Sequence, residues 1–193
     1  FIQALVGLYE YTSITKDPLG LRMFEEGDAE ARAEVPHYDT GAWSMYDQFG
    51  ESDLNYHELL TEFLAHLCER TSRGEPLDAT GAQIPGDQVY CTTAQSFTAD
   101  LHTAPRIALL SKKLAAGTRA GVQLSLSKIA TVSMTVRRGS TVVWRNSATV
   151  EAGRPRLLWV TPRKGGTFTI ELAATDLAGN LSTTSATVIV SRH

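Results

Sequence analysis

The first half of the chain carries apolar residues at the spacing of one helical face. Residues three and four apart share one side of a helix, so this spacing predicts helices over roughly 1–15, 19–34 and 56–70. Asp17-Pro18 ends the first segment and Pro36 ends the second, because the residue before proline avoids the helical region.

The third of these segments has the clearest apolar stripe. Its members are Tyr56, Leu59, Leu60, Phe63, Leu64 and Leu67. Asn55 stands before the stripe with Glu58 three residues on, which is close to the capping-box pattern and predicts that the helix begins at Asn55. After a loop rich in Gly, Pro and Asp, Thr92 or Thr93 can cap a last helix that continues to Leu101. Four helices in about 100 residues predict helix-on-helix packing.

The second half alternates apolar and polar residues, which is the period of a strand with one buried face. The alternation is clear over 122–126, 132–136 and 168–174. Turn signals stand at Arg138-Gly139-Ser140, Lys164-Gly165-Gly166 and Ala178-Gly179-Asn180. They separate about seven such runs, and this spacing predicts an antiparallel sandwich.

Charge divides the chain at the same place. Residues 1–104 carry five Lys and Arg against 18 Asp and Glu, a formal charge of −13, whereas residues 105–193 carry 13 against three, a formal charge of +10. All six Tyr lie in the acidic half, and the basic half is rich in Thr, Val and Ser, as strands are. We therefore predict a multidomain α + β protein with a helical domain over 1–104 and an all-β domain over 105–193, joined at 103–106.

Composition excludes several classes of protein. With 42% hydrophobic and 20% charged residues in 193, the chain can bury a core and is neither disordered nor fibrous. No apolar run approaches the roughly 20 residues of a membrane-spanning helix, so we expect no membrane span. The chain opens on Phe1-Ile2-Gln3, with neither an initiator Met nor a signal peptide, and we expect it to be a fragment of a longer protein.

Chemically versatile side chains are concentrated between the second and third predicted helices. From His37 to His57 there are three Tyr, two His, one Trp and three Asp. Aromatic faces stack on pyranose rings, and carboxylates, phenols and imidazoles hydrogen-bond sugar hydroxyls, so this mixture favours a sugar-binding site. In the alternative interpretation, Tyr38-Asp39-Thr40-Gly41 is a tight turn whose Asp caps backbone amides, and Tyr56 belongs to the buried helical stripe.

The order of these elements resembles the C-terminal domain of the D-glucuronyl C5-epimerases. The matching pieces are Phe1–Glu10, Tyr38-Asp39-Thr40-Gly41, Tyr46-Asp47, and Tyr56-His57 at the start of a helix. The resemblance covers about residues 1–102. It implies that the chain holds the final helices of an incomplete (α/α) toroid, and that the active site is built from tyrosines.

The resemblance also implies roles for individual residues. The expected catalytic residues are Tyr46 and Tyr56. The expected substrate-binding residues are Tyr38, Asp39, Trp43 and His57. The implied reaction converts D-glucuronyl to L-iduronyl units in a heparosan- or heparan-like glycan. A proton α to the carboxylate leaves C5 and one returns on the opposite face, so two acid/base groups must flank the ring. The expected partner is therefore an anionic polysaccharide.

The local charge departs from what this chemistry requires. A phenol acts as a base at neutral pH only where a cation or hydrogen-bond donors lower its pKa from about 10. Residues 47–55 contain three acids and no Lys or Arg, and His57 is the only evident local donor. The resemblance implies a longer stretch with an arginine here in animal members. Either missing upstream residues supply the positive charge, or the substrate and efficiency differ; we expect an isomerase whose fragment alone is inactive.

Two functions of other classes are kept as alternatives. One is a non-catalytic carbohydrate-binding or cell-surface protein that retains the helical fold without turnover. The other is a uronate polysaccharide lyase, which would form the same carbanion and then eliminate across C4–C5.

The basic half has a resemblance of its own. The run Thr167–Val190, and in particular 174–180, looks like the last hairpin of the immunoglobulin-like modules appended to bacterial secreted and surface proteins. This implies an immunoglobulin-like sandwich and a secreted or cell-surface location. Arg137-Arg138 and Arg163-Lys164 are either solubilising edge charges or a track for an anionic polysaccharide.

Other chemistries have little support in the sequence. Cys68 and Cys91 lack metal-type spacing and are either two buried thiols or a disulfide that closes the loop 71–90. The histidines are scattered, so we expect no metal site and no cofactor. There is neither a phosphate-cradling glycine loop nor a nucleophile elbow, and we expect no nucleic-acid partner. The oligomeric state stays open.

Overall fold

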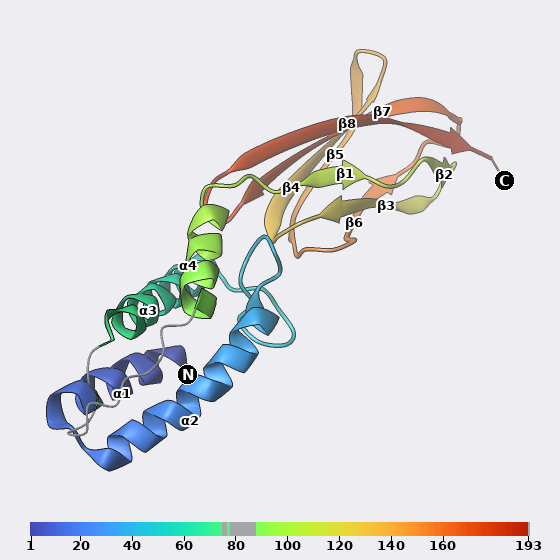
Figure 1. Cartoon of the computed structure of the whole chain (residues 1–193). Coiled ribbons are helices and arrows are strands. Elements are labelled where there is room, and N and C mark those ends of the chain that lie inside the picture. The colour runs from blue at the N-terminus through green and yellow to red at the C-terminus, as the bar shows by residue number, and fades with distance from the viewer. Residues whose placement is uncertain (75–76, 78–87, 193) are drawn as a thin grey trace. The chain divides into compact units, whose positions relative to one another are not determined.

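The computed structural model describes residues 1–74, 77 and 88–192. The chain divides into two compact units, Phe1–Leu101 and His102–His193. Within the described residues, the first unit consists of four α-helices and a short 3-10 helix, and the second of eight strands (Figure 1). The predicted order of a helical part followed by a β part is confirmed.

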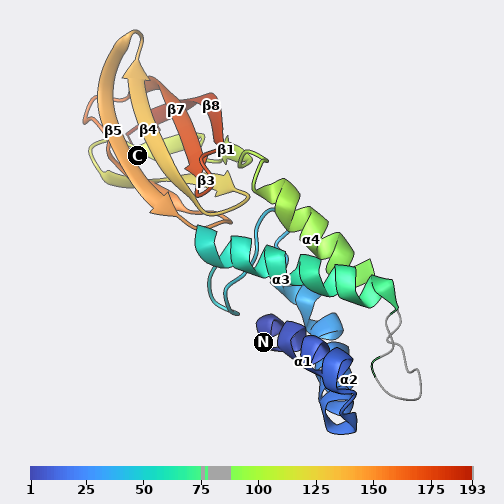
Figure 2. The same cartoon turned by 90° about the vertical axis from the view of Figure 1, so that its left-hand side faces the viewer.

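The helices of the first unit lie close to the segments that the apolar spacing predicts. They are α1 (Ile2–Thr15), α2 (Pro18–Glu34), η1 (Val35–Tyr38), α3 (Leu54–Arg73) and α4 (Gln88–Asp100). Pro18 occupies the first turn of α2, where a missing N–H costs nothing, and the Asp17 carboxylate accepts a hydrogen bond from the Leu19 amide at 3.0 Å. Helices α3 and α4 lie side by side (Figure 2).

Two helix starts differ from the prediction. The cap of α3 is Asp53, whose carboxylate accepts a hydrogen bond from the Tyr56 amide at 2.9 Å, so the helix begins before Asn55. Asp and Asn accept hydrogen bonds from the free amides of the first turn about equally well, and Asp53 precedes Asn55 in the chain, so the helix starts from Asp53. Helix α4 begins at Gln88, and the Thr92 hydroxyl donates to the Gln88 carbonyl at 2.8 Å inside the helix.

The core of the helical unit joins all four helices. Tyr9 of α1 meets Phe24 of α2 edge to face, with ring centroids 5.4 Å apart. The other buried members include Leu5, Leu64, Leu67, Tyr90 and Phe97. Cys68 and Cys91 form a disulfide that links α3 to α4, so they are not the two buried thiols of the alternative interpretation.

The second unit is a pair of sheets around one core. Its strands are β1 (Ile107–Leu109), β2 (Lys113–Ala115), β3 (Arg119–Leu126), β4 (Ala130–Arg138), β5 (Thr141–Val150), β6 (Arg156–Val160), β7 (Gly166–Asp176) and β8 (Leu181–Ser191). One sheet has the order β1-β3-β6 and the other the order β2-β8-β7-β4-β5. Figure 2 shows β5, β4, β7 and β8 in this sequence. The β2–β8 pair is parallel, whereas the alternation predicted antiparallel strands throughout.

The alternating pattern separates the two faces of each strand. Inward positions of both sheets hold apolar side chains, and Trp159 packs against Phe168 edge to face at 5.2 Å. Asp176 fixes the predicted turn at 178–180. One oxygen of its carboxylate lies 2.7 Å from the buried Lys128 ammonium, and the second oxygen accepts a hydrogen bond from the backbone amide of Asn180 at 2.8 Å. A paired and hydrogen-bonded charge is the form in which a charge is tolerated inside a core.

The disulfide generates a stability prediction. Replacing Cys68 and Cys91 together by Ala removes a covalent cross-link between two residues that lie 23 positions apart in the sequence. We expect the free energy of unfolding of the helical unit to fall by about 3 kcal/mol, mainly because the unfolded chain gains conformations. Denaturant unfolding followed by circular dichroism at the helical wavelength measures the loss. Reducing agent should weaken the native chain and leave the double variant unchanged; equal stability of the two chains without reducing agent would contradict the prediction.

Candidate functional site

The polar loop between η1 and α3 is folded by its own side chains. The Asp39 carboxylate accepts a hydrogen bond from the Gly41 amide at 2.7 Å, and the Thr40 hydroxyl accepts one from the Trp43 amide at 2.9 Å. Gly41 has a φ of 74°, which glycine adopts without strain. The tight turn proposed as the alternative interpretation is therefore present. Asp39, expected to bind substrate, caps this turn.

A second turn presents Tyr46. The Tyr46 amide donates to the Gly50 carbonyl at 2.9 Å, and the Asp47 carboxylate accepts hydrogen bonds from the Phe49 and Gly50 amides. Isolated bridges Asp39↔Ser44 and Met45↔Glu51 connect the two turns. Tyr46 is thus held at the start of a short turn that is closed by backbone and carboxylate bonds.

Trp43 and His57 anchor this loop to the helices. Their rings stack with centroids 3.7 Å apart, and the Trp43 indole donates to the Ser52 carbonyl at 2.9 Å. His57 Nε2 lies 3.0 Å from the Phe97 carbonyl, and Nδ1 lies 3.2 Å from the Ser44 amide and 2.9 Å from its hydroxyl. A carbonyl only accepts and an amide only donates, so His57 is neutral with its proton on Nε2.

Burial gives this pair a structural role. Trp43 and His57 are expected to bind substrate, yet both are 0% exposed. Their polar atoms contact Ser52, Ser44 and Phe97 inside the fold, and the substrate-binding role stays a prediction. The pair fixes the loop against α3 and α4.

Tyr46 and Tyr56 lie together on the outside of this anchored segment. Tyr46 is 56% exposed and Tyr56 is 48% exposed, and their rings meet edge to face with centroids 4.7 Å apart. Tyr56 therefore does not belong to the buried stripe, in contrast to the alternative interpretation. The hydrogen bond with Tyr56 raises the pKa of Tyr46, and the negative charges of Asp47 and Asp53 act in the same direction. At neutral pH the Tyr46 phenol is protonated.

The two phenols stand at a cavity of about 570 Å³. Three of the predicted site residues, Tyr38, Tyr46 and Tyr56, line it. The other lining residues are Phe1, Ile2, Gln3, Glu30, Ala31, Glu34, Val35, Met45, Ser52, Leu59, Leu60, Phe63, Leu64 and Phe97. A lining of apolar side chains together with phenols suits the face of a sugar ring. None of the described lining residues is Lys or Arg, so the cavity offers hydrogen bonds and apolar contact without a cationic side chain.

Sequence reasoning missed the contribution of α2. Glu30 and Glu34 bring two carboxylates to the cavity from the last turns of that helix. Their spacing of four residues, which places both on one helix face, is the signal that points to a shared surface. In the described part of the chain, no helix is long and apolar enough to cross a membrane, and no group of three or more His, Cys, Asp or Glu could hold a metal ion.

The comparison with protein families gives a match over the same region. Residues 1–78 match the family model described as the D-glucuronyl C5-epimerase C-terminus. This match supports the D-glucuronyl C5-epimerase C-terminal family for the helical unit. It spans the helices α1 to α3 and every residue that the sequence analysis assigned to the epimerase-like site. The immunoglobulin-like interpretation of the β unit stays a prediction.

Comparisons with whole proteins add little to this family match. None of the curated proteins matches the chain. A crystal structure of an engineered protein is similar with 16% sequence identity and a TM-score of 0.38, over 68% of this chain and 36% of that chain. The chain thus spans about a third of the length of that protein.

The anchoring role of His57 can be tested by truncation. In His57→Ala the Ser44 amide and the Phe97 carbonyl lose their buried partner and a cavity opens, so we expect a loss of about 2–4 kcal/mol in the free energy of unfolding. The exposed His37 provides the matched control, and His37→Ala should change stability by less than about 0.5 kcal/mol. Denaturant unfolding measures both; similar effects of the two variants would refute the anchoring role.

The phenol pair generates a titration prediction. The pKa of Tyr46 lies above 10, and Tyr56→Phe removes both the hydrogen bond and the neighbouring ionisable phenol, so the pKa of Tyr46 should move down toward 10. Carbon-13 NMR of labelled tyrosine rings between pH 8 and pH 12 follows this titration. Tyr11→Phe, at an exposed tyrosine hydrogen-bonded to Asp17, is the control and should leave the pKa of Tyr46 unchanged. An unchanged pKa of Tyr46 in Tyr56→Phe would show that the two phenols do not interact.

Proposed function

We propose that the helical unit is part of a glucuronyl C5-epimerase, an isomerase that inverts C5 of D-glucuronyl units in a heparosan- or heparan-like polysaccharide. The observation that carries the proposal is the exposed Tyr46–Tyr56 pair, which lines a largely apolar cavity inside the segment that matches the epimerase family model. Phenols are suited to this chemistry because one group can hold, donate or accept a proton beside a sugar ring.

In this proposal the two tyrosines act on one face of the sugar. A ring sandwiched between two groups needs a contact of about 3.5–4.0 Å on each side, so flanking groups stand roughly twice that distance apart. The Tyr46 and Tyr56 centroids are 4.7 Å apart, which leaves no room for a pyranose between them. The pair therefore serves as one of the two acid/base groups, and the second group lies across the ring.

In this proposal the phenol pair acts as the acid at this face, because a protonated phenol donates. Tyr46 returns a proton to C5, and Tyr56, whose ring meets it edge to face, orients it. The base on the opposite face removes the original C5 proton, and the electron pair left at C5 is delocalised into the adjacent carboxylate until the new C–H bond forms. The net result is inversion with no change in oxidation state.

The substrate carboxylate requires positive charge, and no described side chain of this cavity supplies it. A C5 proton becomes acidic enough only if the carboxylate is neutralised by donors or cations, and the described lining residues include Glu30 and Glu34 but neither Lys nor Arg. We propose that the opposite base and this cation come from a part of the enzyme outside the 193 residues. An (α/α) toroid would supply them from its preceding helices, so the present chain by itself would bind without turnover.

We further propose that the protein works outside the bacterial cytoplasm, at the cell surface or as a secreted enzyme. The Cys68–Cys91 disulfide supports this location, because disulfides persist in oxidising compartments. A polymeric glycan would also be met there.

Exchange at C5 tests the function. The full-length protein is incubated with heparosan in deuterated water, and deuterium at C5 is followed by NMR. We expect exchange by the full-length protein, a loss of about 10²–10⁴-fold in Tyr46→Phe, and a clear loss in Tyr56→Phe. The matched control Tyr11→Phe lies at an exposed tyrosine outside the cavity and should exchange at the native rate. The 193-residue chain alone should show no exchange.

The remaining outcomes separate the alternatives. Undiminished exchange in both cavity variants would show that Tyr46 and Tyr56 are not the acting groups. Binding of heparosan without exchange by the full-length protein would identify a non-catalytic carbohydrate-binding protein. Unsaturated products that absorb in the ultraviolet would identify a lyase.

A further inference from the structure

The β unit carries far more positive charge than its own acids can neutralise. Residues 105–193 hold 13 Lys and Arg and three Asp and Glu. Asp176 is paired with Lys128 in the interior, and Glu171 is paired with Arg137 at 2.9 Å. The surplus cations of this unit therefore face solvent or a partner.

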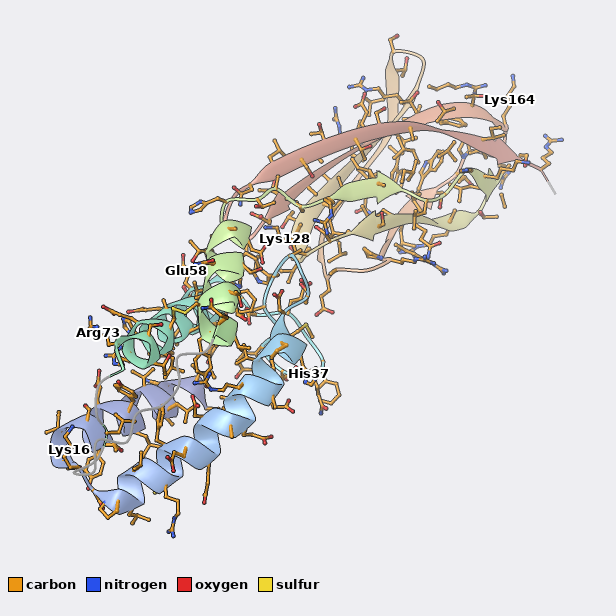
Figure 3. The ribbon with its side chains drawn as sticks, viewed as in Figure 1. Lys16, His37, Glu58, Arg73, Lys128 and Lys164 are labelled. Carbon is orange, nitrogen blue, oxygen red and sulfur yellow. A yellow bond between two sulfur atoms is a disulfide. The ribbon has the colours of Figure 1, made fainter. Side chains whose placement is uncertain are left out.

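Much of this surplus gathers at one end of the sandwich, here called the basic end. Its members are Lys113, Arg119, Arg138, Arg163, Lys164 and Arg192, all exposed. Strand register brings them together: β3 begins at Arg119 opposite Val160, the end of β6, and Lys113 of β2 is paired with Ile189 near the end of β8. In Figure 3 nitrogen-tipped side chains surround the end of the unit where Lys164 is labelled.

Close contacts connect the loops that carry these residues. The Gly117 amide donates to the Pro162 carbonyl at 3.1 Å, and the Ala116 amide donates to the Ser191 carbonyl at 2.9 Å. The Arg163 side chain lies against Gly117, and the Arg138 guanidinium lies against Gly166 and over the Phe168 ring at 5.6 Å. Hydrogen bonds and side-chain contacts between loops of both sheets therefore hold the cations of the basic end near one another.

The distribution argues against charges placed only for solubility. The outward positions of the larger sheet are largely Thr and Ser, as in the hydroxyl pairs Thr131–Thr149 and Ser133–Ser147. Solubilising charges would be interspersed with acids over such faces. Instead, among the described residues no acid is paired with any of the six cations of the basic end. Like charges held together repel one another, and an anionic partner relieves that repulsion.

We infer that the basic end docks an anionic polysaccharide through the carboxylates or sulfates of its hexuronate units, separately from the cavity of the helical unit. Arg binds carboxylate and sulfate groups through paired N–H donors, and several cations in a row match a repeating polyanion. The choice of a uronate polymer, rather than another polyanion, rests on the proposed function. The large exposed apolar side chains of the described β unit include no aromatic residue, which disfavours single-stranded nucleic acid, whose bases stack on exposed aromatic rings.

Binding of heparosan to the 193-residue chain tests this inference, with carboxyl-reduced heparosan as the uncharged control and a duplex DNA of similar length as the competing polyanion. The test variant carries Arg163→Glu, Lys164→Glu and Arg192→Glu. The matched control carries Arg106→Glu, Arg145→Glu and Arg154→Glu, which make the same change in net charge at exposed positions outside the basic end. Isothermal titration calorimetry at 50 and 200 mM salt measures the affinity, and thermal unfolding checks that both variants are folded.

We expect the native chain to bind heparosan more weakly at the higher salt, because counterions are released on binding. The test variant should lose at least tenfold in affinity and the matched control less than threefold. Carboxyl-reduced heparosan should bind the native chain at least tenfold more weakly than heparosan does, and equally well to all three chains. Equal losses in the two variants, no binding by the native chain, or tighter binding of DNA than of heparosan would each overturn the inference. C5 exchange by the full-length protein with the same three substitutions separates this proposal from the proposed function. If this variant binds heparosan more weakly but exchanges at the native rate at saturating heparosan, the docking surface and the reacting site are two different sites.

Discussion

The imidazole of His57 has a hydrogen-bond partner on each ring nitrogen, and these partners belong to different elements, the loop at Ser44 and helix α4 at Phe97. Both bonds are buried, and a buried donor or acceptor that is left without a partner costs the free energy of its desolvation. The loop, the first turn of α3 and the end of α4 are therefore fixed as one piece. Tyr56 precedes His57 and Tyr46 follows Ser44 by two residues, so this buried anchor sets the positions of both exposed phenols.

The periodicity of the sequence was sufficient to predict four helices and the strands β3, β4 and β7, because burial of one face is a local signal that survives in the order of residues. Details that depend on competition between neighbours were not predictable. Asp53 and Asn55 can both cap a helix, and only the path of the preceding loop decides that Asp53 accepts from the Tyr56 amide. The parallel β2–β8 pair depends on how the chain crosses between sheets, which a three-residue strand does not reveal.

The candidate site was predictable as a cluster and unpredictable in its orientation. The concentration of aromatic and polar residues between two helices located the loop, yet the same composition serves a buried anchor and an exposed site. Trp43 and His57 went inward because they stack on one another and find carbonyl and serine partners, whereas Tyr46 and Tyr56 stayed outside. Glu30 and Glu34 of α2 reach the cavity through the packing of the helices, which a sequence motif in a loop cannot reveal.

The division of charge limits what each unit can contribute to chemistry on an anionic polymer. The described residues that line the cavity of the acidic unit include phenols and acidic residues but no Lys or Arg, so in the proposed function this cavity orients a sugar and donates a proton while the cation comes from elsewhere. Salt screens exposed charges over about 8 Å at physiological ionic strength, so the exposed cations of the β unit act on a polyanion only at short range. In the inference above, their effect is to raise the local concentration of the polymer. Acidity at C5 has to come from a group that touches the substrate, and this requirement separates holding the glycan from activating it.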